Sequence, residues 1–315
     1  MPIPPEFSFR HGGTGGDCGA RALARGARPR RAKAEDPAGP PRHRRRPADR
    51  RARALEVGEP DRRERRALRR GLRRGVAHQL VRAGVALNTL RYVFITHHHS
   101  DHNLDYGNLI YDAWAAGLRA PVDAYGPPPI KAMTEAYFQL NRFDIETRIG
   151  DEGRPDLRKL VTAHEFAEPG PVMQNADVKV SAARVRHPPI VHAYAYRFDA
   201  ADRAIVISGD TAYSPELIAL AKGADVLVHE TMHLGGLESL LKRVPNAATL
   251  REHLHASHTV TEDIGRVAAA AGVKTLVLSH FVPPDDGSIS DDMWMEGARK
   301  HYGGTIVVGR DLLEI

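Results

Sequence analysis

The 315-residue chain has one cysteine and no long hydrophobic run. With Cys18 alone, intramolecular disulfides and zinc sites built from cysteines are excluded, so any metal must be held by nitrogen and oxygen. No apolar run approaches the roughly 20 residues that a membrane span needs. The start, Met1 to His11, lacks the basic and apolar regions of a secretory signal. We therefore expect a cytoplasmic protein with no membrane partner.

Aromatic and β-branched residues are scarce between residues 17 and 74. Residues 21–74 hold 20 arginines and one lysine against seven acidic residues, whereas the rest of the chain is acidic. Such a stretch buries too little apolar surface to offset its ordering entropy, so it should be disordered or loosely helical. Three interpretations stay open: an arginine-rich tail that binds nucleic acid, a solvated tail without partners, or a frameshifted stretch. In the last case, the gene's other frames should encode strands rich in Val and Ile.

From residue 75 onward the hydrophobic pattern is that of a folded α/β protein. Ser214 supplies an N-cap for one helix, and Thr259 with Glu262 predicts a capping box for another. We expect strands at 90–96, 178–187, 194–198, 204–208, 225–229, 275–279 and 305–308, and helices at 76–83, 214–223 and 260–271.

Four of these apolar runs are followed by a residue that can bind a metal. These residues are His97, His187, Asp210 and His280. Ligands often gather where strands end on one edge of a sheet. The pattern therefore predicts a single site built from distant segments.

The strongest local motif is His97-x-His99-x-Asp101-His102. In an extended segment, residues two apart point the same way, so His97 and His99 can converge on one ion. A turn into a helix would bring Asp101 and His102 to the same pocket. Imidazole and carboxylate ligands suit Zn²⁺ best, with Mn²⁺ or Fe²⁺ as alternatives.

Residues 96–102 resemble the signature of the metallo-β-lactamase superfamily, and the downstream blocks resemble its tRNase Z and arylsulfatase-like branch. This resemblance implies a four-layer αββα sandwich over residues 75–315. Residues 1–16 would be a remnant of the first strand and its glycine-rich turn. It also implies two divalent ions: His97, His99 and His187 on the first, Asp101, His102 and His280 on the second, and Asp210 bridging both.

The same resemblance implies a catalytic pair. His229-Glu230-Thr231 and His258-Thr259 match two further blocks of the branch, which makes His258 the general acid and Glu230 its partner. Asp101 would also orient the nucleophile. The alternative is that His258 and Glu230 only support the metal site structurally. His253 and His255 we expect to be surface residues.

We predict a hydrolase that uses hydroxide generated at the two ions to cleave a phosphodiester, sulfate ester or related small-molecule ester. A tRNA 3′-processing endoribonuclease is the alternative. The chain outside residues 21–74 is acidic, and residues 126–186 mix both charges instead of forming a basic RNA-gripping arm. These features favour the small ester over RNA; a homodimer stays open.

Another alternative is a catalytically impaired metal-binding protein. The strands that should follow the glycine-rich turn at 12–16 are missing from the sequence, which would leave one sheet with an open edge. The predicted ligands all lie outside the anomalous segment.

Overall fold

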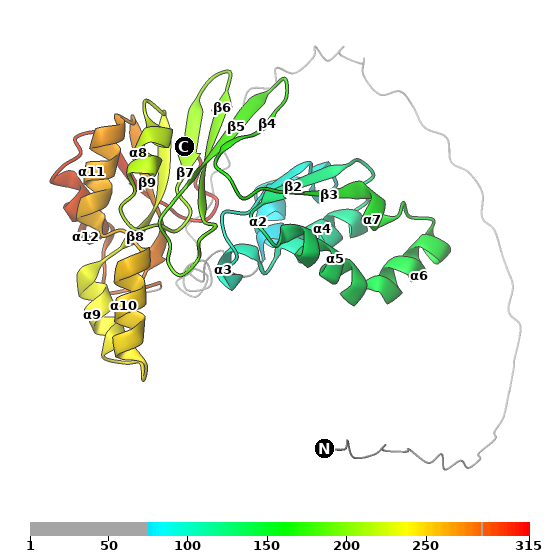
Figure 1. Ribbon diagram of the computed structural model, residues 1–315, viewed down its shortest axis with the longest axis horizontal. Coiled ribbons are helices and arrows are strands. Elements are labelled where there is room, and N and C mark those ends of the chain that lie inside the picture. The colour runs from blue at the N-terminus through cyan, green and yellow to red at the C-terminus, as the bar shows by residue number, and fades with distance from the viewer. Residues whose placement is uncertain (1–74, 285) are drawn as a thin grey trace, which may run out of the picture. The chain divides into compact units, whose positions relative to one another are not determined.

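The computed structural model describes residues 75–284 and 286–315 (Figure 1). The predictions for residues 1–16 and 17–74 fall outside this range. Within it, the helices are too short or too polar for any of them to cross a membrane.

The larger sheet has seven strands in the order β10-β9-β8-β7-β6-β5-β4. Strands β4 to β7 are antiparallel neighbours, and β7 to β10 run parallel. Every strand predicted after residue 175 is present. The strands are β4 (Gly170–Gln174), β5 (Val178–Arg184), β6 (Tyr194–Ala200), β7 (Ala204–Ile207), β8 (Val226–Met232), β9 (Thr275–Val282) and β10 (Thr305–Val308).

Helices α8 (Pro215–Ala221), α11 (Thr261–Ala271) and α12 (Asp291–Arg299) pack on this sheet. Ser214 caps α8 as predicted, its hydroxyl accepting from the Leu217 amide at 3.2 Å. The predicted capping box of α11 is wrong, because Val260 and not Thr259 is the N-cap residue and no described side chain caps the helix. The Thr259 hydroxyl instead donates to the Thr211 carbonyl. That bond ties the start of α11 to the loop after β7.

The smaller sheet has three parallel strands, β1 (Tyr92–Phe94), β2 (Val122–Gly126) and β3 (Val161–Glu165). Among the described residues β1 pairs only with β2, so its other edge has no described neighbour. The sequence pattern missed β2 and β3. The helices on this side of the fold are α2 (Val76–Arg82), α3 (Ser100–Asn103), α4 (Tyr106–Ala115), α5 (Ile130–Leu140), α6 (Arg142–Glu152) and α7 (Leu157–Leu160), with the 3₁₀ turn η1 (Leu87–Thr89) before β1.

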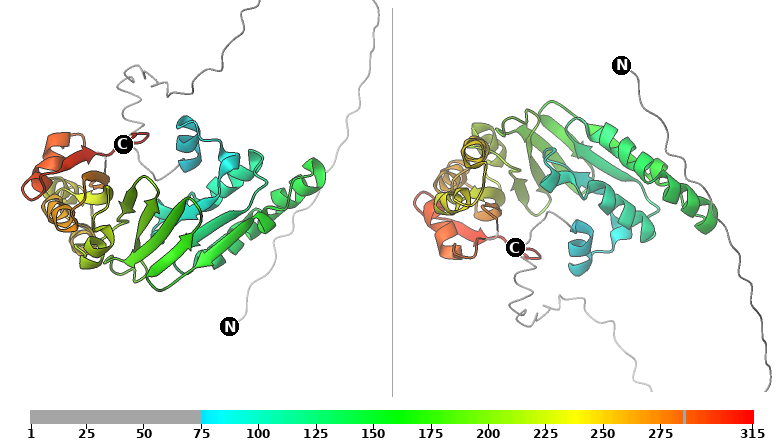
Figure 2. Two further views of the ribbon diagram at one scale, coloured as in Figure 1. Left: turned by 90° about the horizontal axis from the view of Figure 1, so that it is seen from above. Right: turned by 90° about the horizontal axis from the view of Figure 1, so that it is seen from below.

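The two sheets face each other through aromatic side chains. The ring of Phe94 lies 5.6 Å from Tyr196 and 5.2 Å from Phe198, between ring centroids. The Tyr196 hydroxyl donates to the Ile95 carbonyl at 2.8 Å. Figure 2 shows α11 and α12 on one side of the sheets and α5 and α6 on the other. The order is therefore helices, sheet, sheet, helices, as the αββα prediction requires.

A helical hairpin that the sequence pattern did not predict follows β8. It comprises α9 (Leu234–Leu241) and α10 (Ala247–Ser257), which share an apolar cluster with Met232 and Val282. Helix α10 ends at Ser257, directly before His258. The last turn of α10 therefore lies next to His187, whose Nδ1 donates to the Ser257 carbonyl.

Candidate metal centre

The predicted ligands come from four separate segments whose ends meet. His97 follows β1, His187 follows β5, Asp210 follows β7 and His280 lies within β9. Gly209 has φ +59°, and a Cβ there would come 3.0 Å from the Tyr194 carbonyl oxygen, so glycine is required before Asp210. His280 has φ +41° and is the unpaired residue of an irregularity in β9, since Glu230 pairs with Ser279 and Thr231 with Phe281; such strain often marks functional residues.

Three histidines form the first cluster. His99 Nδ1 lies 3.2 Å from His97 Nε2 and 3.0 Å from His187 Nε2. His187 Nδ1 donates to the Ser257 carbonyl at 3.0 Å, which leaves its Nε2 as the lone-pair nitrogen facing the cluster. Three imidazole nitrogens can therefore bind one ion.

Asp101, His102 and His280 form the second cluster. His280 Nε2 lies 3.2 Å from His102 Nε2 and 3.4 Å from Asp101 Oδ2. His98, between the motif histidines, points away and contacts the Pro127 carbonyl at 2.9 Å, as expected for alternating side chains.

Asp210 lies between the two clusters. Its Oδ2 is 3.2 Å from His102 Nε2, 3.4 Å from His280 Nε2 and 4.0 Å from His97 Nε2. Its Oδ1 is buried and has no hydrogen-bond partner in the described part of the chain. A buried carboxylate oxygen without a partner is costly unless a cation satisfies it. The two His/Asp clusters are therefore consistent with a dinuclear metal site.

The pKa values of the histidines differ between the two clusters: they are lowered in the first cluster, whereas that of His280 in the second is raised. Burial lowers the pKa of His97 to about 2 and that of His187 to about 4, which keeps both in the neutral form that binds metal. Burial acts the same way on His280, but its hydrogen bond to Asp101 and the charge of Asp210 prevail and raise its pKa to about 9. Before metal binds, His280 is therefore protonated at neutral pH.

Metal binding should consequently release about one proton per chain at pH 7.5, since His280 must give up its proton to become a ligand. The apparent affinity should weaken about tenfold for each pH unit below the pKa of His280. Calorimetric titration of Zn²⁺ in two buffers of different ionisation enthalpy measures the protons released. Release should vanish near pH 10; equal release at both pH values would contradict the assignment of His280.

His258 and Glu230 are in contact beside the second cluster. His258 Nδ1 lies 3.2 Å from Glu230 Oε2, and Glu230 Oε1 accepts from the Thr259 amide at 2.6 Å. Burial lowers the pKa of His258 to about 4, and burial together with the charge of Asp210 raises that of Glu230. Both shifts favour a neutral pair. Since Asp210, His258 and His280 also lie close enough to share an ion, a ligand role for His258 is a competing interpretation.

His253 lies closer to the clusters than a surface residue would. Its ring centroid is 6.0 Å from that of His99 and 6.1 Å from that of His187. His253 and Ser257 are one turn apart on α10, with 3.4 Å between Nδ1 and the hydroxyl. The sequence carried no signal for this position, because α10 itself was not predicted. His255 is exposed, as expected.

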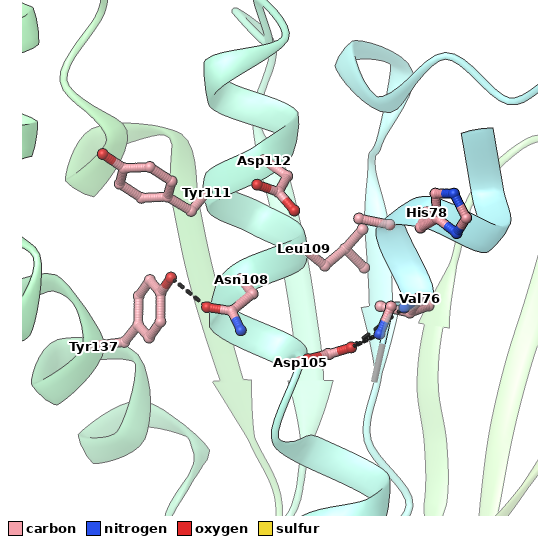
Figure 3. A pocket seen from close by; sticks show the side chains of 10 residues that line it. Val76, His78, Asp105, Asn108, Leu109, Tyr111, Asp112 and Tyr137 are labelled. Carbon is pink, nitrogen blue, oxygen red and sulfur yellow. Dashed lines mark hydrogen bonds between the residues drawn. The ribbon is translucent and has the colours of Figure 1, made fainter. Parts of the chain in front are cut away.

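A separate cavity of about 290 Å³ lies between α2 and α4 and contains none of the predicted ligands (Figure 3). Asp105 accepts from the backbone amides of Gly75 and Val76, and the Tyr137 hydroxyl donates to Asn108 at 2.9 Å. These three side chains thus help to join α2, α4 and α5, and the cavity is distinct from the site formed by the seven converging side chains.

Comparison with known proteins places this geometry in a family. Residues 68–281 match the family model for the beta-lactamase superfamily domain. The chain is 28% identical over 242 residues to ribonuclease Z of Mycobacterium bovis (strain BCG / Pasteur 1173P2), covering 76% of this chain and 84% of the relative. It is 32% identical over 243 residues to ribonuclease Z of Mycobacterium sp. (strain KMS), covering 76% and 82%.

Two solved structures share the fold. The metallo-beta-lactamase fold protein YhfI from Bacillus subtilis aligns with a TM-score of 0.53 at 20% identity, covering 75% of this chain and 82% of that one. The short form of human tRNase Z aligns with a TM-score of 0.51 at 17% identity, covering 76% and 83%. The chain therefore belongs to the metallo-β-lactamase superfamily, close to its ribonuclease Z branch, and is a metal-dependent hydrolase of that fold.

Proposed function

We propose that the protein is an endoribonuclease of the ribonuclease Z type that hydrolyses a phosphodiester bond of precursor tRNA. The observation that carries this proposal is the similarity to ribonuclease Z along 76% of the chain. These relatives support RNA, the alternative substrate in the sequence analysis, better than the small ester that the charge pattern favoured.

The ligand roles follow the two clusters. His97, His99 and His187 would hold one divalent ion, and Asp101, His102 and His280 the other, with Asp210 between them. Bound there, the ions would supply an activated water at neutral pH and stabilise negative charge on the phosphate. Asp101 is partly exposed, so its carboxylate can also accept a hydrogen bond from the attacking water and orient it.

His258 would protonate the departing oxygen. In a neutral pair whose proton resides on Glu230, the carboxyl donates to His258 Nδ1, and Nε2 carries the hydrogen that faces the site. As Nε2 gives up this proton to the leaving group, Nδ1 takes one from Glu230. The Thr259 amide holds Glu230 in place throughout.

One observation favours a small ester instead. The charged side chains of α6 and α7 are engaged with one another, as in Arg142–Glu146 at 2.9 Å, Arg148–Asp144 at 2.8 Å and Arg158–Asp156 at 2.8 Å. Residues 126–186, where an RNA-gripping arm was considered, form strands and helices of the fold itself. A small phosphodiester or sulfate ester is therefore the second candidate.

A salt titration with the metal-loaded full-length chain separates the two candidates. If precursor tRNA is the substrate, its affinity should fall about a hundredfold or more between 50 and 200 mM salt, because phosphate contacts release counterions. Cleavage of a tRNA with a 3′ trailer should stop on chelation and return with added Zn²⁺ or Mn²⁺. Hydrolysis of bis(p-nitrophenyl) phosphate or p-nitrophenyl sulfate without any RNA cleavage would instead favour the small ester.

A further inference from the structure

A second cavity, of about 320 Å³, has His258 in its wall but none of the seven predicted ligands. It is lined by Arg186 after β5, by Tyr213 after β7, by Met232 at the end of β8, and by residues from the last turn of α10 to the first turn of α11. Its volume is at the lower end of the range for small-molecule sites, which suits a single nucleotide.

The backbone of these segments is tightly connected. The Ala212 amide donates to the Arg186 carbonyl at 2.7 Å, and the Arg186 amide donates to the Thr211 hydroxyl at 3.2 Å. The Thr259 hydroxyl donates to the Thr211 carbonyl at 2.5 Å. The cavity wall is therefore held in a fixed position relative to His258.

The side chains of Arg186, Tyr213 and His255 are all free to contact a ligand in the cavity. All three are exposed, and none forms a side-chain hydrogen bond or ion pair with another residue of the described ranges. Asp263 also lines the cavity, but it is paired with Arg266 on the same helix. The guanidinium of Arg186 thus has no described carboxylate to neutralise it, in contrast to Arg197, which binds Asp199 at 2.8 Å and two carbonyls.

We propose that this cavity is a subsite for a nucleoside phosphate that flanks the scissile bond. Arg186 would bind the phosphate, since a guanidinium matches it bidentately, and Tyr213 would stack on the base. His255 would add a hydrogen-bond donor. The inference rests on the proposed function, because the shared His258 is what links the cavity to the site of cleavage.

Calorimetric binding of adenosine 5′-monophosphate to the metal-loaded full-length chain tests the subsite directly. The wild type should bind this nucleotide more tightly than inorganic phosphate, which lacks a base. Arg186→Ala and Tyr213→Ala should each weaken nucleotide binding about tenfold, whereas Tyr213→Phe should keep the affinity because it retains the ring. Arg203→Ala removes an equally charged, exposed side chain outside the cavity and should change nothing. Equal nucleotide affinity in wild type, Arg186→Ala and Tyr213→Ala would overturn the proposal, as would equal affinity of the wild type for the two probes.

Cleavage of precursor tRNA distinguishes a failed subsite from a failed function. Arg186→Ala should lower kcat/KM on the RNA about tenfold. If the wild type cleaves RNA and Arg186→Ala retains both its nucleotide affinity and its kcat/KM, the subsite is wrong and the function stands. If the wild type binds the nucleotide through Arg186 but cleaves no RNA, the nucleotide site stands and the function is wrong.

Discussion

Asp210→Ala should lose both metal content and turnover. This aspartate lies between the two clusters, with its Oδ2 4.0 Å from His97 Nε2 and closer to Nε2 of His102 and His280. A metal ion contributes several kcal/mol of transition-state stabilisation, so we expect kcat/KM to fall about a thousandfold or more. Metal per chain, measured by mass spectrometry after gel filtration, should drop from two ions to one or none.

His99→Ala should give a related but distinguishable result. His99 belongs only to the first cluster, so one ion should be lost while the second cluster keeps its own. Asp202→Ala, which removes an exposed carboxylate remote from the site, serves as the control. Circular dichroism should show that each variant is folded. Full metal content together with wild-type turnover in Asp210→Ala would refute the proposed centre.

His258→Ala should reduce RNA cleavage by about a hundredfold to ten-thousandfold, the usual contribution of a general acid. Metal content should stay at two ions, because in our assignment His258 donates a proton rather than a lone pair. The loss should be much smaller on bis(p-nitrophenyl) phosphate, since p-nitrophenolate leaves readily without protonation. Glu230→Gln should have a milder effect, because the amide can still hydrogen-bond to His258 Nδ1 and accept from Thr259.

The same measurements separate the competing roles of His258. If His258→Ala loses an ion, the histidine is a ligand, as its position beside Asp210 and His280 permits. If it loses activity equally on both substrates while keeping its metal, its role is structural. Only a loss that depends on the leaving group identifies a general acid.

Local sequence determined the parts of the site that lie close together in the chain. The spacing of His97, His99 and His102 sets their directions through the alternation of an extended segment and the turn into α3, so the motif could be interpreted without a structure. The cap of α8 and the strands from β5 onward were likewise evident, because apolar periodicity and capping are short-range effects. The roles of residues 1–16 and 17–74 stay predictions.

Short-range rules failed where long-range packing decides. Strands β2 and β3 escaped prediction because tertiary pairing, not composition alone, makes Val122–Gly126 and Val161–Glu165 extended. The local pattern predicts that Thr259 caps α11, but its side chain bonds the loop after β7 instead. Helix α11 begins at Thr261 with Val260 as its N-cap, so Thr259 lies outside the capping position, and its hydroxyl donates to a carbonyl 48 residues away in the chain.

The sequence by itself determined which residues can bind metal and that several follow apolar runs. Only the tertiary structure decided that His187, Asp210 and His280 come within about 4 Å of the motif histidines, and that the His253 ring lies 6.0 Å from that of His99. It also decided that Arg186 and Tyr213 share a cavity with His258. The reason is that ligand geometry depends on where strand ends meet in space. The relative positions of the strand ends depend on the strand order in each sheet and on how the two sheets pack, and no local sequence pattern encodes either.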